Sequence, residues 1–258
     1  MKKFLTIASA TVFAAVLALA LVGCGGSSDS ADTYKIATDT TFAPFEYQNA
    51  DGEYEGIDVD ILAAVAEDQG FEYELDPLGF DAALQAVQSG QADAVIAGMS
   101  ITDERKQTFD FSDAYYDSTV CCAVSSSSKI ASLDDLKGKK VATKTGTQSA
   151  AWAESIADQY GFEVTTFDTS DVMYQDVTAG NSVACFEDTP VMSYAISTGS
   201  VDLKIINTVD SDSEFATPYG FAVKKGENSE LIEKFNAGLA NIKANGKYDE
   251  IVSKYVQG

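Results

Sequence analysis

Residues 81–97 read Asp-Ala-Ala-Leu-Gln-Ala-Val-Gln-Ser-Gly-Gln-Ala-Asp-Ala-Val-Ile-Ala, the pattern of a helix that ends at Gly90 and leads into an apolar strand. We expect Asp81 to cap this helix and residues 92–97 to form the strand. The second half of the chain repeats the arrangement, because a helix near 171–179 ends before Gly180 and a strand over 182–186 follows. Strands and helices alternate in both halves, which predicts two α/β lobes, each with a central parallel sheet flanked by helices.

The elements around this repeated unit follow the same rules. In the first half we expect a strand over 34–38, a hairpin over 46–56, a helix capped by Asp58 and ended by Gly70, and a strand over 71–75. In the second half we expect a strand over 140–144, a helix over 149–160, a strand over 162–167, and a helix opened by residues 188–190. The tail, 228–255, is predicted to be helical with a break at Gly246, and to return to the first lobe.

Two extended segments, 115–120 and 218–222, join the halves and are rich in residues that favour strands. Two crossings between two lobes are typical of a hinge. We therefore expect the boundaries to be 33–116 plus 221–258 for lobe 1, 121–216 for lobe 2, and 117–120 with 217–220 for the hinge.

The first residues have the order of a secretory signal. Two lysines precede an apolar run over 4–22, and Leu21-Val-Gly-Cys24 is similar to a lipobox. We expect residues 1–23 to be a signal peptide, Cys24 to be lipidated, and residues 24–32 to be a flexible tether. The protein would then be exported and lipid-anchored to the outer face of the cell membrane, or periplasmic in a two-membrane bacterium. A single transmembrane anchor is the alternative, but the run is rich in alanine and stops at the lipobox.

Composition excludes several classes of function. The net charge is −23, which repels phosphate backbones and anionic lipids, so we expect no nucleic-acid partner and no membrane contact beyond the lipid. The chain has no histidine, which excludes the common Ser-His-Asp and Cys-His catalytic sets and histidine-based zinc sites. Cys121, Cys122 and Cys185 lack metal-ligand spacing; they are either buried thiols or include one bond to Cys185. We expect no metal, no cofactor and no catalytic residue.

The ends of the predicted strands collect polar side chains. Ligands of open α/β sheets bind beyond the carboxyl ends of the strands, and here those ends supply one guanidinium, one ammonium and several carboxylates. This combination suits a zwitterion. Phenylalanines would form apolar walls around it. The candidate residues are Asp39, Phe42, Phe80, Gly98, Ser100, Arg105, Lys144, Gln148, Glu187 and Asp188.

Three of these candidates have clear chemical roles. Arg105 can bind a carboxylate through two parallel hydrogen bonds, and Gln148 adds donors at the start of a helix. Asp188 can face an ammonium group. Taken singly, each has a plainer interpretation: Arg105 as an ion pair with a neighbouring acid, Asp39 and Asp188 as caps, the phenylalanines as core and Lys144 as a surface lysine. Their joint position at strand ends favours a binding site.

The chain resembles the polar amino-acid-binding proteins of ABC importers, the family 3 extracellular solute-binding proteins, from about Tyr34 to Tyr255. The motifs that carry the resemblance are residues 39–45, 56–60, 100–105, 109–112, 146–147 and 187–190. It implies a two-lobed periplasmic-binding-protein type II fold with a two-strand hinge, in a monomer that delivers an amino acid to a membrane permease. It also implies that Arg105, Ser100 and Gln148 bind the α-carboxylate, while Asp188, Ser100 and the Gly98 carbonyl bind the α-amino group.

The same resemblance bears on specificity. Asp39 and Lys144 occupy positions that hold the side-chain amide in glutamine-binding members, and Lys144 would repel a cationic side chain. Glu187 and Gln148 depart from the glutamine pattern, which often has histidine and glycine there. Glutamine is therefore the expected ligand, with asparagine, cystine or arginine as alternatives. A dehydratase-type enzyme on the same scaffold, with Glu187 as general acid, is the rival; the complete amino-acid clamp argues against it.

Overall fold

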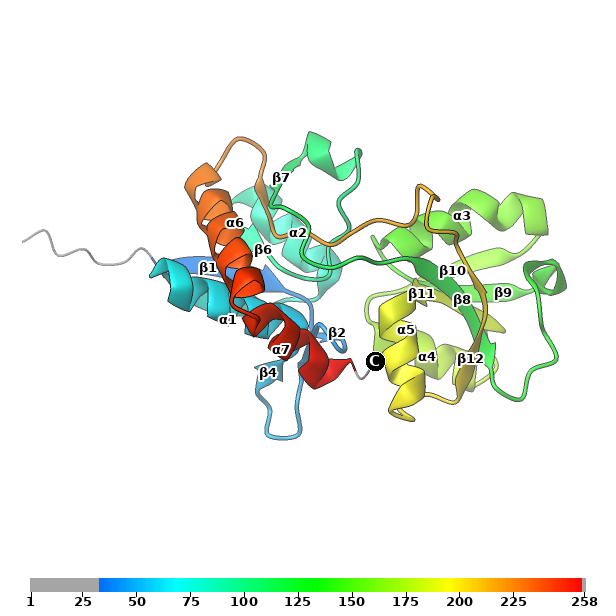
Figure 1. Ribbon diagram of the computed structural model, residues 1–258. Helices are drawn as coiled ribbons and strands as arrows, with labels where there is room; N and C mark the ends of the chain where they lie inside the picture. Colours follow the sequence, from blue (N-terminus) through cyan, green and yellow to red (C-terminus); the bar gives the residue numbers. More distant parts are fainter. Residues whose placement is uncertain (1–32, 257–258) are drawn as a thin grey trace, which may run out of the picture. The chain divides into compact units, whose positions relative to one another are not determined.

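Two five-stranded sheets form the centres of the two lobes in the computed structural model, which describes residues 33–256 (Figure 1). The first sheet has the order β5-β1-β6-β13-β7, formed by β1 (Thr33–Thr38), β5 (Glu72–Pro77), β6 (Ala94–Val95), β7 (Phe109–Phe111) and β13 (Ala222–Lys224). The second has the order β10-β9-β11-β8-β12, formed by β8 (Val120–Ser125), β9 (Lys140–Lys144), β10 (Glu163–Phe167), β11 (Ala184–Asp188) and β12 (Leu203–Thr208). A three-stranded sheet of β2 (Thr41–Phe42), β3 (Glu46–Gln48) and β4 (Tyr54–Glu55) contains the expected hairpin.

The expected parallel pairing holds for only part of each sheet. β1 runs parallel to β5 and β6, and β9 runs parallel to β10 and β11, as expected for strands joined through helices. β13, however, is antiparallel to β6 and β7, and β8 is antiparallel to β11 and β12. β8 and β13 are the strands that follow the two crossings between the halves. They enter from the other half instead of through a covering helix, so the right-handed crossover rule does not set their direction.

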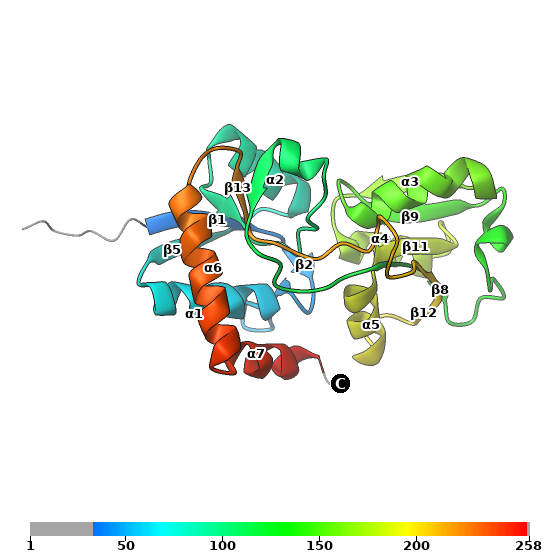
Figure 2. The ribbon, with the colours of Figure 1, turned by 45° about the horizontal axis from the view of Figure 1, so that its top comes forward.

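Seven α-helices cover these sheets within residues 33–256. They are α1 (Ile57–Gln69), α2 (Phe80–Ser89), α3 (Gln148–Tyr160), α4 (Ser170–Thr178), α5 (Thr189–Ser197), α6 (Ser229–Ala244) and α7 (Lys247–Tyr255), with short 3-10 turns η1 (Arg105–Gln107) and η2 (Leu133–Leu136). The predicted tail is confirmed. α6 and α7 are separated at Gly246 and pack on α1, as Figures 1 and 2 show for the orange and red helices.

Glycines end three helices as expected, but two predicted caps are wrong. Gly70, Gly90 and Gly161 adopt the left-handed conformation that closes α1, α2 and α3. Asp58 and Asp81 lie inside the first turns, because Gly56 and Gly79 hold the cap positions of α1 and α2. The strand expected over 92–97 is also shorter, since only Ala94 and Val95 pair with neighbours.

Alternation along the strands gives each sheet two apolar faces. Ile36 packs with residues of α1 and α6, whereas its neighbour Ala37 packs with α2 on the opposite face. In the second sheet, Cys121 and Cys122 also point to opposite faces, which prevents a bond between them. These two thiols and Cys185 are buried and free.

No helix within residues 33–256 combines the length and the apolar character that crossing a bilayer requires. The predicted signal peptide, the lipidation site at Cys24 and the tether all fall before residue 33, so they lie outside the described residues.

We predict that Gly56→Ala destabilises the protein far more than Gly70→Ala, although both glycines flank α1 and both have positive φ. A Cβ at position 56 would lie 2.1 Å from the Phe45 carbonyl oxygen at φ 138°, while a Cβ at position 70 would meet nothing within 4 Å. Urea unfolding should therefore show a loss of about 3 kcal/mol or more for Gly56→Ala. Gly70→Ala should cost about 1–2 kcal/mol, the ordinary penalty of a left-handed residue. Equal losses would contradict the close approach at Gly56.

Candidate functional site

The candidate residues lie where strands of both sheets end. Asp39 follows β1 and Lys144 ends β9, and the structure brings these two side chains into a direct ion pair. Asp39 is 0% and Lys144 1% exposed, so the pair is removed from water. Both residues were expected to contact the side chain of a ligand, and here they contact each other. The plainer interpretation of Lys144 as a surface lysine is wrong.

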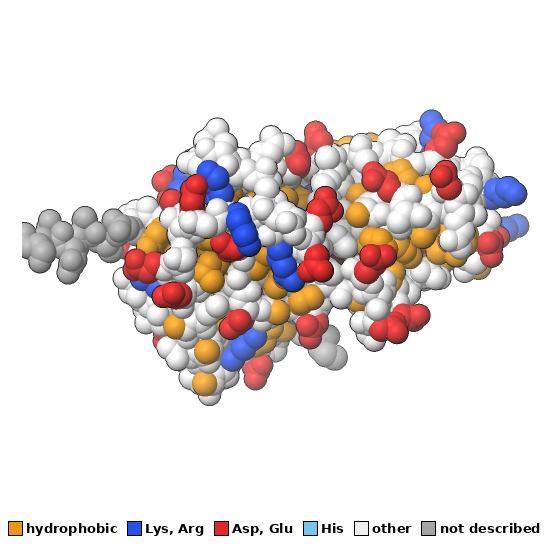
Figure 3. All heavy atoms as spheres, turned by 90° about the horizontal axis from the view of Figure 1, so that it is seen from above, with side chains coloured by type: hydrophobic (Ala, Val, Ile, Leu, Met, Phe, Trp, Pro, Cys, Tyr) orange, Lys and Arg blue, Asp and Glu red, His pale blue; other side chains and the backbone are white. Residues whose placement is uncertain are grey.

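Aromatic rings surround the Lys144 ammonium. Its Nζ lies 4.8 Å from the centre of the Phe42 ring and 5.9 Å from that of Phe80. Burial alone would lower the pKa of Lys144, but the carboxylates of Asp39 and Glu187 outweigh it and leave the pKa raised. The ammonium therefore stays charged between apolar walls, where cation–π attraction adds to the ion pair. Its setting differs from that of the charges on the outer surface, where Asp and Glu side chains are spread across the face shown in Figure 3.

Arg105 is the second cation of the site. Its guanidinium donates to the Ser100 carbonyl at 2.9 Å and, from the other half of the chain, to the Gly146 carbonyl at 2.9 Å. It also lies 5.3 Å from the centre of the Phe80 ring. Burial lowers the pKa of Arg105 to about 10, which still leaves it charged at neutral pH. Asp103, a neighbour that could have paired with it, binds Lys106 instead.

Asp188 faces inward from the start of α5. It occupies the cap position without a side-chain capping bond, and its Oδ2 accepts a hydrogen bond of 2.5 Å from the Tyr219 hydroxyl. Burial and the nearby Glu187 raise the pKa of Asp188 to about 7, against the lowering effects of Tyr219 and Arg105. An ammonium group beside this carboxylate would favour its ionised form.

Three hydrogen bonds fix the side chain of Glu187. Its Oε2 accepts from the Ser170 and Tyr174 hydroxyls, each at 2.9 Å, and its Oε1 accepts from the Asp188 backbone N–H at 3.0 Å. Three donors stabilise the ionised form of a carboxyl group, and they leave few lone pairs free to accept a hydrogen bond from a ligand. Burial nevertheless leaves the pKa of Glu187 raised, against the lowering effects of Lys144 and of these three donors.

The remaining candidates shape the walls of the site. Gly98 has φ +53°, and a Cβ there would lie 2.4 Å from Cε1 of Phe42, so the ring occupies the space that a side chain would need. Ser100, 3% exposed, forms a backbone bridge with Tyr219. Gln148 begins α3 directly after Thr147, whose side chain caps the helix by accepting from the Ala150 N–H at 3.1 Å. Gln148 itself is half-buried at this helix start.

Two buried carboxyl groups behind the site were missed by the sequence analysis. Asp58, taken for a helix cap, accepts hydrogen bonds on Oδ2 from the Gly98 N–H and the Tyr115 hydroxyl, both at 2.7 Å. Glu46 of β3 is 0% exposed and lies against Asp58. The sequence did contain a signal for the burial of Asp58. Asp58 lies on the same helix face as Ile61 and Leu62, and a residue on that face points into the core.

The surroundings of Glu46 favour its protonated form. Within residues 33–256, both Glu46 oxygens and Oδ1 of Asp58 have no hydrogen-bond partner, so two ionised carboxylates would face each other with no donor between them. Burial, together with the charges of Asp58 and Asp39, raises the pKa of Glu46 well above its ordinary range. Burial also raises the pKa of Asp58, to about 6, despite its donors. A proton on Glu46 would give the free Oδ1 of Asp58 a donor, while Oδ2 of Asp58 holds the Gly98 N–H.

Tyr219 is a further residue that the sequence placed only in a connecting strand. Its hydroxyl donates to Asp188 and accepts from Ser118 at 2.9 Å, and its ring packs edge-on to Phe45 with centroids 5.0 Å apart. The strand that crosses between the halves thus supplies a hydrogen bond to the site itself.

A family model described as "Bacterial extracellular solute-binding proteins, family 3" matches residues 34–258. The chain belongs to this family. The resemblance predicted from the motifs, and the two-lobed type II fold that it implied, are therefore confirmed.

Named relatives of this family 3 protein include receptors for several solutes. The arginine-binding extracellular protein ArtP of Bacillus subtilis is 31% identical, with 100% of this chain and 99% of ArtP covered. Substrate-binding domain 2 of Lactococcus lactis GlnP, in an open conformation, is 46% identical with a TM-score of 0.60, covering 88% of this chain and 96% of that one. An ancestral arginine-binding protein bound to glutamine is 37% identical with a TM-score of 0.79, covering 88% of this chain and 98% of that one.

We predict that Glu46→Gln gains stability relative to the wild-type family 3 protein as pH rises. The raised pKa means that the folded state binds the Glu46 proton more tightly than the unfolded chain, whose group titrates near 4.5. The wild-type protein therefore loses up to about 1.4 kcal/mol per pH unit as pH rises above that value towards the folded pKa. The amide side chain of the Glu46→Gln variant does not titrate, so the variant does not lose stability in this way.

Urea unfolding of both proteins between about pH 5 and about pH 7 would measure this difference. Glu53→Gln, in the exposed part of the same hairpin, is the matched control and should follow the wild-type curve. A pH-independent difference between Glu46→Gln and wild type would show that Glu46 is not protonated by folding.

Proposed function

We propose that this protein is the receptor of an amino-acid ABC importer, which binds a polar L-amino acid, glutamine, and delivers it to a membrane permease. The observation that carries the proposal is the pairing of opposite charges. Arg105 donates to the Ser100 carbonyl, Ser100 pairs with Tyr219, and the Tyr219 hydroxyl donates to Asp188, so the guanidinium and the carboxylate lie near enough to shift each other's pKa. A zwitterion would satisfy both, with its carboxylate at Arg105 and its ammonium at Asp188. Ser100, Gln148 and the Gly98 carbonyl would complete the two ends.

The positions of these groups suggest how the two lobes would close on a ligand. Residues 33–116 with 221–258 would act as one lobe and 121–216 as the other, with 117–120 and 217–220 bending between them. Arg105 already donates across to the Gly146 carbonyl, so the guanidinium can bind the ligand and the facing half together. The ligand would favour the closed arrangement because it binds groups from both halves. A monomer suffices for this mechanism.

Glutamine is the ligand that the side-chain end of the site favours. Lys144 neutralises Asp39 and lies between Phe42 and Phe80, where a cationic side chain would otherwise fit. A carboxamide can replace this direct contact, because its NH2 donates to Asp39 while its oxygen accepts from Lys144. The solved ancestral relative described as bound to glutamine shows that an arginine-binding protein of this family can take an amide side chain.

The export route is part of the same proposal. Residues 1–23 would be removed as a signal peptide, Cys24 would carry the lipid, and residues 24–32 would tether the receptor to the outer face of the membrane. Lipid anchoring keeps a receptor near its permease, which raises the local concentration of loaded protein.

We predict that glutamine raises the melting temperature in a saturable manner and that Arg105→Ala abolishes most of the effect. Removing the guanidinium strands the ligand carboxylate, at a cost of about 2–5 kcal/mol of binding free energy. Calorimetry on the purified protein measures this cost. Lys106→Ala, next along the chain and exposed, is the control that should bind as wild type does. If none of the common amino acids shifts the melting temperature, the proposed function is wrong.

We further predict that Lys144→Ala weakens glutamine binding and strengthens arginine binding. Loss of the ammonium removes the donor to the amide oxygen, worth about 1.5–3 kcal/mol for a charged hydrogen bond. It also frees the Asp39 carboxylate and the two rings for a guanidinium, so arginine should bind about tenfold tighter than it does to wild type. Calorimetric titration with both amino acids tests the reversal. Lys140→Ala, at the exposed start of β9, should change neither affinity. An equal loss for every amino acid would contradict the amide role of Lys144.

A further inference from the structure

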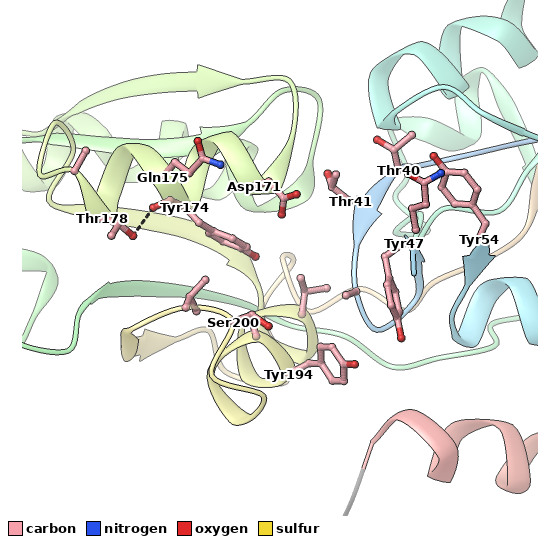
Figure 4. Close-up of a pocket in the computed structure, with 16 residues that line it drawn as sticks. Thr40, Thr41, Tyr47, Tyr54, Asp171, Tyr174, Gln175, Thr178, Tyr194 and Ser200 are labelled. Carbon is pink, nitrogen blue, oxygen red and sulfur yellow. Dashed lines mark hydrogen bonds between the residues drawn. The ribbon is translucent and has the colours of Figure 1, made fainter. Parts of the chain in front are cut away.

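A cavity of about 920 Å³ lies beside the amino-acid site and takes no part in the proposed function. Its walls come from the β2–β4 region on one side and from α4 and α5 on the other (Figure 4). Figure 4 shows Asp171 and Tyr174 on one side of this space, Thr41 and Tyr47 on the other, and Tyr194 below. The volume is within the range of cavities that hold small molecules, about 300–1,000 Å³.

The cavity adjoins the side-chain end of the amino-acid site. Thr40, which lines the cavity, donates its backbone N–H to Oδ1 of Asp39 at 2.6 Å. Tyr174, from the opposite wall, donates its hydroxyl to Glu187 at 2.9 Å. Each of these two buried carboxylates is thus held by a residue that also faces the cavity. A chain that continues past the ligand's amide would pass between them.

The chemistry of the lining favours a positive charge. Asp171 is the one formally charged residue among those that line the cavity in the described chain, and no lysine or arginine lines it. Tyrosines 47, 54, 174 and 194 contribute rings or hydroxyls to the same walls. Aromatic faces and a carboxylate together form the surroundings that ammonium groups prefer. The net charge of −23 adds a long-range attraction for cations.

Lys144 decides which cations can use this cavity. Its ammonium lies at Asp39 and repels a positive charge placed directly on the ligand's side-chain end. A positive charge carried several methylenes further would lie beyond Lys144 and within reach of Asp171. The site therefore discriminates by the distance between the α-carbon and the second positive charge.

We propose that this cavity is an outer subsite for a cationic group joined to the side-chain amide of the bound amino acid, as in a glutamine whose amide nitrogen bears an aminoalkyl chain. The inference rests on the proposed function, since the clamp at Arg105 and Asp188 must hold the amino-acid head. The protein would accept γ-glutamyl amides of diamines in addition to glutamine.

Calorimetry of the full protein with three ligands tests this inference: glutamine, N5-(4-aminobutyl)glutamine and its uncharged analogue N5-butylglutamine. We expect the aminobutyl compound to bind within about tenfold of glutamine and more tightly than the butyl compound, because only its ammonium can reach Asp171. Asp171→Asn should weaken the aminobutyl compound about threefold to fivefold, the usual size for an exposed ion pair, and leave glutamine unchanged.

Two further variants separate the subsite from general effects. Asp176→Asn removes a charge from the same helix outside the cavity lining and should leave all three affinities unchanged. Thr178→Trp, on the exposed lining of α4, should exclude both extended ligands while glutamine still binds.

Glutamine binding without binding of the aminobutyl compound would overturn the outer subsite and leave the proposed function intact. Equal weakening by Asp171→Asn and Asp176→Asn would also overturn it, since the effect would then be one of net charge. If neither glutamine nor its derivatives bind, the failure lies in the proposed function.

Discussion

The buried ion pair between Lys144 and Asp39 is the contact on which the rest of the site depends. It joins the ends of β9 and β1, one strand from each sheet, and removing both charges from water costs several kcal/mol for each ion. A direct ion pair recovers this cost only when its geometry is good and the remaining lone pairs are satisfied. Here the Thr40 N–H satisfies Oδ1 of Asp39, and two aromatic rings enclose the ammonium. A ligand amide can enter this pair because it offers both a donor and an acceptor, which most other groups lack.

Behind this pair, the site is supported by a second layer of buried carboxyl groups. Asp58 holds the Gly98 N–H, and Gly98 begins the segment that leads to Ser100 and Arg105. Glu46 lies against Asp58, and burial raises the pKa values of both groups, which favours a proton on one of the two. Three acids, Asp39, Glu46 and Asp58, thus share one region with a single nearby lysine. A neutral Glu46 lowers the electrostatic repulsion among these three carboxyl groups.

The helix-glycine-strand unit at 81–97 and its echo near 171–186 were enough to predict two α/β halves, because glycine-ended helices and short apolar strands are local signals. Directions of strands that cross between the halves were not predictable from such signals, since they depend on which element the chain returns to. Asp58 and Asp81 were misassigned because aspartate near a helix start usually caps it, and glycine took that position in both helices. Asp39, Arg105, Lys144 and Asp188 were proposed from strand ends and family motifs, and the structure shows the first and third of them paired. Glu46 and Tyr219 were missed because their partners are distant in sequence and appear only when the chain is folded.

Gly98 and Phe42 also constrain how this site can change over evolutionary time. The phenylalanine ring occupies the volume into which any side chain at position 98 would project, so the two residues are not free to vary independently. A larger residue at 98 avoids this clash only in a background where position 42 has already lost its ring, and it still carries the strain of the positive φ. The reverse order passes through a protein with a damaged ligand loop. Lineages that reshape this wall must therefore alter position 42 first, which makes the history of the site directional.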